Sequence, residues 1–353
     1  MPIKLDPARI EREWREFSRK LSRLGEDLRR QPPALPEVSP RQELYRDDSV
    51  TLYHYRNASA PTNRTPLLVV YSLINRPSIL DLRPDRSLIG ALRDGGSEVY
   101  LLDWGYPGPA DRFVTLDDYV NVHLDRAVRE ICQRHGCPQV ALLGVCQGGT
   151  LALCYAALHP QRVRSLITLV TPVDFDAGDS VLRKLSKHVD FDRVVDASGN
   201  VSAAALNAIF VSLKPYRLLS QRYVDMLDLA GDEAALTEFM RMERWMYDSP
   251  DQAGEAFRQF AKEFYQDNAL VRGGVRLGDQ AVDLGRLTMP IYNVFASGDH
   301  LIPPASSRAL GDLARSRDYR TLELDSGHLG VFISGRTQRT LFPALVQWLR
   351  CHD

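Results

Sequence analysis

The sequence lacks the features that mark several broad classes of protein. Its 353 residues carry a formal net charge of −1, so no excess of one sign favours binding to nucleic acid or to an anionic membrane. No apolar run is long enough to cross a bilayer, and the N-terminal stretch MPIKLDPARIEREW lacks the basic segment and apolar run of a signal peptide. We therefore expect a globular protein with no membrane span and no nucleic-acid partner.

Cysteine is scarce as well, with five residues spread over the chain. The number is odd, and the spacing matches neither a disulfide framework nor a zinc site. This usage favours a reducing, cytoplasmic setting, and we expect no bound metal. The five residues are Cys132, Cys137, Cys146, Cys154 and Cys351.

Short apolar runs alternate with helical stretches along most of the chain. Hydrophobic residues make up 44% of the sequence, which suits one large domain or a domain with an insertion. Several runs are continuously apolar, as expected for strands that are covered on both faces. The pattern predicts an α/β fold with a mostly parallel sheet. The predicted strands are 51–56, 67–73, 98–104, 139–145, 165–171, 291–297 and 320–325.

The interval 172–289 breaks this alternation, because it contains helices and loops with aromatic and methionine clusters such as FMRMERWMY (239–247). An inserted helical cap is the simplest interpretation, since the sheet pattern resumes after the interval; a separate helical domain is the alternative. The predicted organisation is an N-terminal helix with its linker (1–40), a first core part (41–171), the cap (172–289) and a second core part (290–353).

Near the N-terminus, apolar residues recur at steps of four and three in a stretch otherwise rich in Arg and Glu. This is the heptad pattern of a helix seam, and it ends at a proline-rich linker, QPPALPEVSP (31–40). Two interpretations stay open: the seam packs on the protein's own surface, or it docks a partner. Its residues are Ile10, Trp14, Phe17, Leu21, Leu24 and Leu28.

The stretch LLGVCQGGT (142–150) reads as a buried strand, a tight turn and the start of a helix. It matches the nucleophile elbow of hydrolytic enzymes with Cys146 at the tip, flanked by small residues that let strand and helix approach. A helix N-terminus favours thiolate there, and the backbone N–H of Gln147 is placed to donate to an oxyanion. A buried structural cysteine is the alternative, and it is our interpretation of Cys132, Cys137 and Cys154.

The same pattern requires an acid and then a histidine, in that chain order. Asp299 follows a predicted strand, and His328 follows the last one between glycines, so we predict the triad Cys146–His328–Asp299. His300 adjoins Asp299 and is the alternative partner of that carboxylate. A second oxyanion donor is expected from the loop YSLINRP (71–77), contributed by Ile74 or Asn75.

Several segments resemble the catalytic subunit of two-component, class III polyhydroxyalkanoate synthases, from about Leu44 to Leu349. The stretch DSPDQAGEAFRQF (248–260), within the predicted cap, is specific to such synthases rather than general to α/β hydrolases. The other segments are YSLINRPSILDLRPDRSL (71–88), LLDWGYPGPADR (101–112), LLGVCQGG (142–149), TLVTPVDF (168–175), SLKPYRL (212–218), DHLIPP (299–304) and SGHLGVFISG (326–335).

The resemblance implies an α/β-hydrolase core with an inserted cap, and Cys146, His328 and Asp299 match the family's nucleophile, base and acid. It implies polymerisation of (R)-3-hydroxyacyl-CoA, chiefly 3-hydroxybutyryl-CoA, into polyester with release of CoA, and no cofactor beyond that substrate. It also implies a non-catalytic PhaE-type partner subunit, a homodimer, and a place in the cytoplasm at the surface of polyester granules. The alternatives are a cysteine-nucleophile esterase of the dienelactone-hydrolase kind and a non-catalytic granule scaffold.

Overall fold

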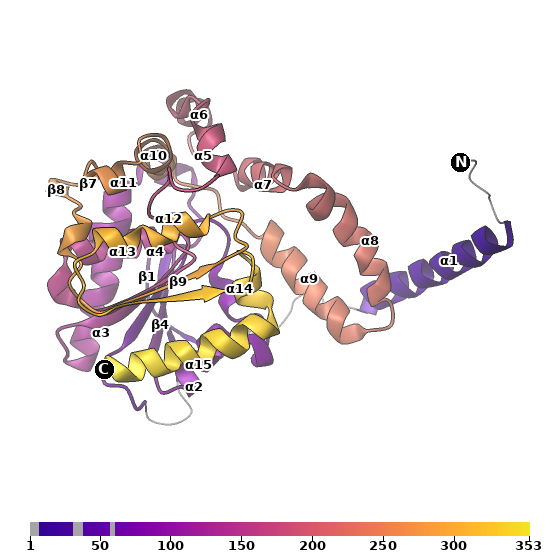
Figure 1. Cartoon of the computed structure of the whole chain (residues 1–353), viewed down its shortest axis with the longest axis horizontal. Coiled ribbons are helices and arrows are strands. Elements are labelled where there is room, and N and C mark those ends of the chain that lie inside the picture. Colours follow the sequence, from indigo (N-terminus) through magenta and orange to yellow (C-terminus); the bar gives the residue numbers. More distant parts are fainter. Residues whose placement is uncertain (1–6, 31–37, 57–60) are drawn as a thin grey trace. The chain divides into compact units, whose positions relative to one another are not determined.

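The computed structural model describes residues 7–30, 38–56 and 61–353, and these divide into two compact units. Helix α1 (Pro7–Arg30) and Ala204–Asp248 form one unit, which is helical (Figure 1). The rest of the described chain forms the other unit around a sheet. The boundaries between the two units fall inside the interval 172–289. That this interval acts as a cap stays a prediction. The linker predicted over 31–40 lies mostly outside the described residues.

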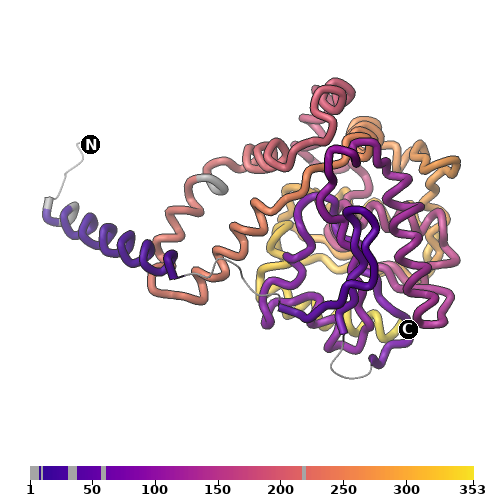
Figure 2. Tube along the Cα trace, turned by 180° about the vertical axis from the view of Figure 1, so that it is seen from behind, coloured from indigo at the N-terminus to yellow at the C-terminus, as the bar shows by residue number. Residues whose placement is uncertain are grey.

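The larger unit is built on an eight-stranded sheet with the order β1-β2-β4-β3-β5-β6-β9-β10. The strands from β4 to β10 run parallel, whereas β1 and β2 pair antiparallel at one edge and face the viewer in Figure 2. Seven strands coincide with predicted runs, and β1 is additional. The strands are β1 (Gln42–Asp47), β2 (Val50–Tyr55), β3 (Leu67–Val70), β4 (Val99–Asp103), β5 (Val140–Val145), β6 (Val163–Leu169), β9 (Ile291–Ala296) and β10 (Tyr319–Leu324).

Helices cover both faces of the sheet, which explains why the central strands β3 and β5 are apolar and buried at every position. Helices α2 and α15 pack together on one face, and α3 and α4 lie on the other (Figure 1). The helices of this unit are α2 (Leu88–Asp94), α3 (Asp125–His135), α4 (Gln147–Leu158), α5 (Val181–Ser186), α6 (Phe191–Ser198), α10 (Gly254–Gln259), α11 (Ala269–Arg272), α12 (Pro304–Arg308), α13 (Leu310–Leu313), α14 (Gly330–Ile333) and α15 (Gly335–Cys351). A small hairpin joins β7 (Arg276–Leu277) to β8 (Gln280–Ala281).

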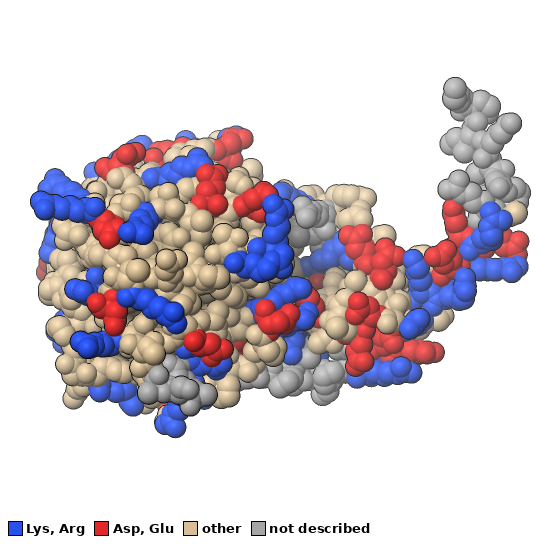
Figure 3. Space-filling view, turned by 60° about the horizontal axis from the view of Figure 1, so that its bottom comes forward, with Lys and Arg blue, Asp and Glu red and all other residues tan. Residues whose placement is uncertain are grey.

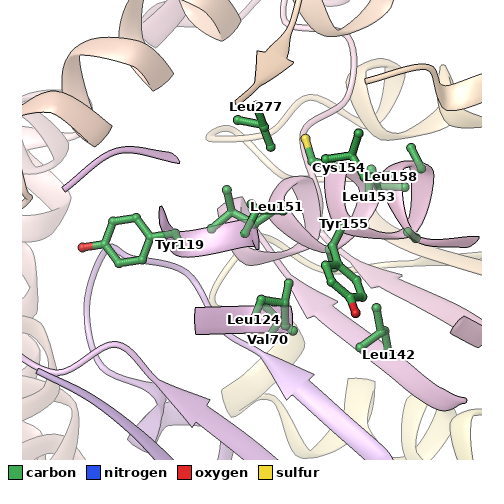
Figure 4. Close-up of a cluster of buried hydrophobic side chains, with 14 of the residues drawn as sticks. Val70, Tyr119, Leu124, Leu142, Leu151, Leu153, Cys154, Tyr155, Leu158 and Leu277 are labelled. Atoms are coloured by element: carbon green, nitrogen blue, oxygen red, sulfur yellow. The ribbon is translucent and has the colours of Figure 1, made fainter. Parts of the chain in front are cut away.

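Helix α4 lies at the centre of the core, and all twelve of its residues are buried. Its side chains pack on Leu142 of the sheet and on residues of the preceding helical segments, as Figure 4 shows. The Tyr155 hydroxyl donates a hydrogen bond to Asp125 at 3.0 Å, so this buried polar group is satisfied. Burial raises the pKa of the Cys154 thiol to about 12, which fits the structural role predicted for that cysteine.

The smaller unit consists of α1 and the helices of Ala204–Asp248. Leu24 of α1 is buried, Lys20 pairs with Asp228 at 2.8 Å, and the N–H of Gly231 donates to Asp27 at 3.0 Å. The first half of the predicted seam is different, because Trp14 is 67% exposed. Phe17 and Leu21 are exposed beside it. The helices here are α7 (Ala203–Ser212), α8 (Arg222–Met226) and α9 (Glu233–Tyr247).

Charged side chains of both signs are mixed over the face drawn in Figure 3, in line with the net charge of −1. None of the helices in the described ranges combines the length and the apolar character that a membrane crossing needs.

The close approach of α4 to the turn after β6 depends on Gly149, because a Cβ there would overlap the Thr171 side chain. We expect Gly149→Ala to lower the free energy of unfolding by about 1–3 kcal/mol, measured by denaturant titration. The double variant Gly149→Ala, Thr171→Ala should recover part of that loss, since the two closest atoms of Thr171 are removed. A double variant no more stable than Gly149→Ala alone would show that the overlap is not the cause.

Candidate active site

The predicted nucleophile lies at the turn between β5 and α4. Cys146 has φ 52° and ψ −126°, a conformation that non-glycine residues rarely adopt. The backbone holds it in place, since its N–H donates to the Leu169 carbonyl and its carbonyl accepts from Gly149, both at 2.9 Å. Every other residue between Val140 and Leu158 is buried, and only Cys146 is partly exposed. The turn therefore presents one partly exposed thiol beside a core of buried residues.

The predicted acid and histidine follow two neighbouring parallel strands, β9 and β10, whose carboxyl ends meet at one edge of the sheet. Asp299 Oδ2 and His328 Nδ1 are 2.7 Å apart, and both side chains are almost completely buried. The other carboxylate oxygen of Asp299 accepts from the N–H groups of Leu301 and Ile302, each at 2.9 Å. The carboxylate is thus fixed by its own turn and holds one imidazole nitrogen.

The imidazole of His328 also interacts electrostatically with Cys146. Burial by itself lowers the pKa of His328, but the interactions with Cys146 and Asp299 outweigh it and raise this pKa to about 10. An imidazolium between a sulfur and a carboxylate is the arrangement expected of a thiolate–imidazolium pair. The structure thus brings together the three side chains that the sequence order selected.

The remaining histidine candidates lie elsewhere. His300 is exposed, and the imidazole that Asp299 holds is that of His328. His135 pairs with the Tyr100 hydroxyl at 2.7 Å and His159 with Asn121 at 2.9 Å, and burial lowers the pKa of both.

The loop after β3 contains both candidates for the second oxyanion donor. The N–H of Ile74 donates to Ser72 Oγ at 3.0 Å. Asn75 has φ 60°, and within the described part of the chain its N–H has no hydrogen-bond partner. Gln147 begins α4, where helix N–H groups lack intrahelical partners. Both Ile74 and Asn75 therefore stay candidates for the second donor. Gln147, the first predicted donor, lies at the N-terminal end of α4.

Two supports of this loop were not apparent from the sequence. The Gln147 side-chain oxygen accepts from the Leu73 N–H at 3.2 Å and from the Ser72 hydroxyl at 3.4 Å. Arg76 donates to Asp103 at 2.7 Å and to the Gly105 carbonyl at 3.0 Å. For the contacts of Gln147, the only sequence signal was a polar residue directly after the nucleophile. Nothing in the spacing indicated that Ser72 and Leu73 would be its partners.

Among the described residues, no group of three or more His, Cys, Asp and Glu side chains is arranged to hold a metal ion.

Comparisons with known proteins place the chain in a family. Residues 66–334 match the family described as alpha/beta hydrolase fold, which confirms the predicted fold class. The chain is also similar to the monoacylglycerol lipase of Paleococcus ferrophilus, with a TM-score of 0.53, over 86% of this chain and 99% of that one. At 17% identity, that likeness concerns the fold alone.

Much closer similarity is found to two proteins called poly(3-hydroxyalkanoate) polymerase subunit PhaC. The protein from Allochromatium vinosum is 48% identical over 350 residues, which cover 99% of both chains. The protein from Thiocystis violacea is 44% identical over 349 residues, which cover 99% of this chain and 98% of that one. Because this identity extends over nearly the whole of each chain, the protein belongs to the poly(3-hydroxyalkanoate) polymerase family, subunit PhaC, whose members are acyltransferases on the α/β-hydrolase fold.

Proposed function

We propose that this protein polymerises (R)-3-hydroxyacyl-CoA, chiefly (R)-3-hydroxybutyryl-CoA, and releases CoA through acyl-thioester intermediates on Cys146. The observation that carries the proposal is the series of interactions from Asp299 through His328 to Cys146, at a strained turn in a member of this polymerase family. The relatives' shared name favours polymerisation over the esterase alternative. CoA enters with the substrate and leaves as a product, so no resident cofactor is required.

In the first half-reaction, the Cys146 sulfur attacks the carbonyl carbon of the CoA thioester. The new C–S bond forms, the bond to the CoA sulfur breaks, and the imidazolium of His328 gives its proton to the departing CoA thiolate. The oxyanion that develops on the carbonyl oxygen accepts from the Gln147 N–H and from the N–H of Ile74 or Asn75. One thioester replaces another, so the acyl group stays activated.

In the second half-reaction, a hydroxyl group at C3 of another acyl unit attacks the thioester on Cys146. His328, now neutral, takes the hydroxyl proton while the new C–O bond forms and the C–S bond to Cys146 breaks. An oxygen ester is more stable than a thioester, so this step runs downhill. A serine at position 146 would form the oxygen ester one step early and leave less driving force for chain growth.

Asp299 has the role of orienting and stabilising the imidazolium of His328. Its two oxygens already accept from Leu301, Ile302 and His328, which favours an orienting carboxylate over an independent base.

The helical insertion 172–289 is proposed as a cap that limits water access, because water would hydrolyse the acyl-enzyme. An insoluble polyester product would place the protein at granule surfaces in the cytoplasm, and we propose that it acts as a homodimer.

We expect Cys146→Ala to abolish CoA release from 3-hydroxybutyryl-CoA, because no other thiol lies at the elbow. Free thiol would be followed together with insoluble polyester, with Cys154→Ala as the matched control on the same helix. The control should keep its activity, since Cys154 is buried and its thiol is poorly ionised. Sustained CoA release by Cys146→Ala would rule out the assigned nucleophile.

We expect Asp299→Asn to lower the pKa of His328 from about 10, because the carboxylate that stabilises the imidazolium is removed. The sign follows from the charge. In the parent protein the raised pKa keeps His328 protonated up to high pH, whereas in the variant His328 loses its proton at a lower pH. NMR titration of ring-labelled histidine measures the shift, and CoA release should fall about 10²–10⁴-fold. A His328 titration unchanged from the parent protein would contradict the orienting role.

We also propose that α1 docks a non-catalytic PhaE-type subunit through the exposed side chains of Trp14, Phe17 and Leu21. These three are consecutive residues of the heptad seam, and the Trp14 and Phe17 rings stack with centroids 5.8 Å apart. Leu24, in the second half, is buried within the protein and is not available to a partner. An exposed apolar stripe of this kind is typical of a docking helix.

The double variant Trp14→Ala, Phe17→Ala should lose most of the partner subunit on co-purification, because two aromatic contacts disappear from the stripe. The matched control is Arg12→Ala, Glu16→Ala, which changes the polar side of the same helix. Equal recovery of the partner with both double variants would argue against docking through the stripe.

A further inference from the structure

The segment DSPDQAGEAFRQF (248–260) has no task in the reaction steps proposed above, although it is the part of the interval 172–289 that is specific to synthases. From Ser249 onward it belongs to the larger unit, together with the sheet. Gln252 pairs with Val201 in an antiparallel bridge, in which each N–H donates to the other residue's carbonyl, at 2.8 and 2.9 Å. Gln252 is buried, so both its backbone and its side chain have a fixed place in this unit.

The loop 71–76, here called the oxyanion loop, is expected to supply the second oxyanion donor, and none of its residues belongs to a strand. Side chains from elsewhere in the fold bind its backbone instead. The Trp104 indole donates to the Tyr71 carbonyl at 2.8 Å, and the Gln147 side chain accepts from the Leu73 N–H at 3.2 Å. Nε2 of Gln252 donates to the Leu73 carbonyl at 2.8 Å. The conformation of the loop therefore depends on these partners.

The hydrogen bond from Gln252 fixes the peptide group that carries one of the two candidate donors. The carbonyl of Leu73 and the N–H of Ile74 belong to the same planar, trans peptide group, and they point in opposite directions. On its other side this group is held as well, since the Ile74 N–H donates to Ser72 Oγ at 3.0 Å. The next peptide group, which carries the N–H of Asn75, follows directly from the one that Gln252 holds.

A second residue of the same segment contacts the oxyanion loop. The Ser249 hydroxyl donates a hydrogen bond to Asn75 Oδ1. Asn75 has φ 60°, in the left-handed region that few residues other than glycine adopt, so a contact with its side chain helps to keep it there. The contacts of Gln252 and Ser249 therefore lie on either side of Ile74 and hold the part of the loop that contains both candidate N–H groups.

We propose that Gln252 is a positioning residue of the active site, which acts through the Leu73 carbonyl to aim the oxyanion loop at the oxygen that becomes negatively charged. Ser249 supports the same loop through Asn75. The proposal rests on the function proposed above and gives the synthase-specific segment a part in it. An oxyanion donor stabilises the transition state only when it is already in place, so a displaced loop slows the chemical step more than it weakens substrate binding.

Gln252→Met keeps the length of the side chain and removes its donor. It should lower kcat for CoA release from 3-hydroxybutyryl-CoA by about 10- to 100-fold and leave KM nearly unchanged, because the lost interaction matters only in the transition state. The matched control is Gln259→Met in the same segment, which removes a hydrogen bond of 2.8 Å from the Leu116 N–H, outside the oxyanion loop. The control should keep its kcat.

Alkylation of Cys146 by iodoacetamide separates the oxyanion loop from the triad. In this reaction the thiolate attacks a saturated carbon and iodide leaves, so no oxyanion forms and the rate depends on the thiolate alone. The rate at Cys146, followed by mass spectrometry of its peptide, should be the same in Gln252→Met and in the parent protein. A parallel fall in alkylation and CoA release would show that the variant disturbs the triad, and would overturn the positioning role.

If Gln252→Met does not fold, Ser249→Ala removes the other contact and should lower kcat by a smaller factor, again without a change in KM or in alkylation. An unchanged kcat in the variant that folds, or equal losses in Gln252→Met and Gln259→Met, would overturn the positioning role while leaving Cys146 as the nucleophile. CoA release that persists in Cys146→Ala would instead overturn the proposed function itself.

Discussion

The hydrogen bond between Asp299 and His328 is the interaction on which the site depends. Its 2.7 Å contact joins two nearly buried side chains, and two backbone N–H groups hold the carboxylate from the other side. A buried carboxylate with these partners stays where its turn puts it, so the imidazole ring has one orientation and one free nitrogen. The imidazole also interacts electrostatically with Cys146, and the proposed chemistry follows from this order of interactions.

The sheet explains why three residues far apart in the sequence can meet with such accuracy. Strands β5, β9 and β10 are parallel members of one sheet, and a functional residue follows each of them at the carboxyl end. Helices on both faces bury every residue of β5 and β9, which fixes the strand ends from which Cys146 and Asp299 follow. Strain at Cys146 is maintained because the strand before it and the helix after it are both locked in the core.

Sequence reasoning found the elements whose signal is local and missed those that depend on distant partners. The buried strands and the residues after them could be predicted, because apolar runs and strand-end Asp299 and His328 are visible within a few positions. Strand β1 was missed, since QELYRD carries three charged residues and pairs only at the sheet edge. The support that the Gln147 side chain gives to Leu73, 74 positions away, is likewise a product of folding.

The turn after Asp299 holds the acid in place with its own backbone. Leu301 and Ile302 donate their N–H groups to one carboxylate oxygen, and the other oxygen contacts His328. A displacement of this turn would move the carboxylate and, with it, the imidazole ring that the carboxylate orients. Alignment of the triad therefore depends on the backbone of this turn as much as on the three side chains, and a small shift there would cost much of the catalytic rate.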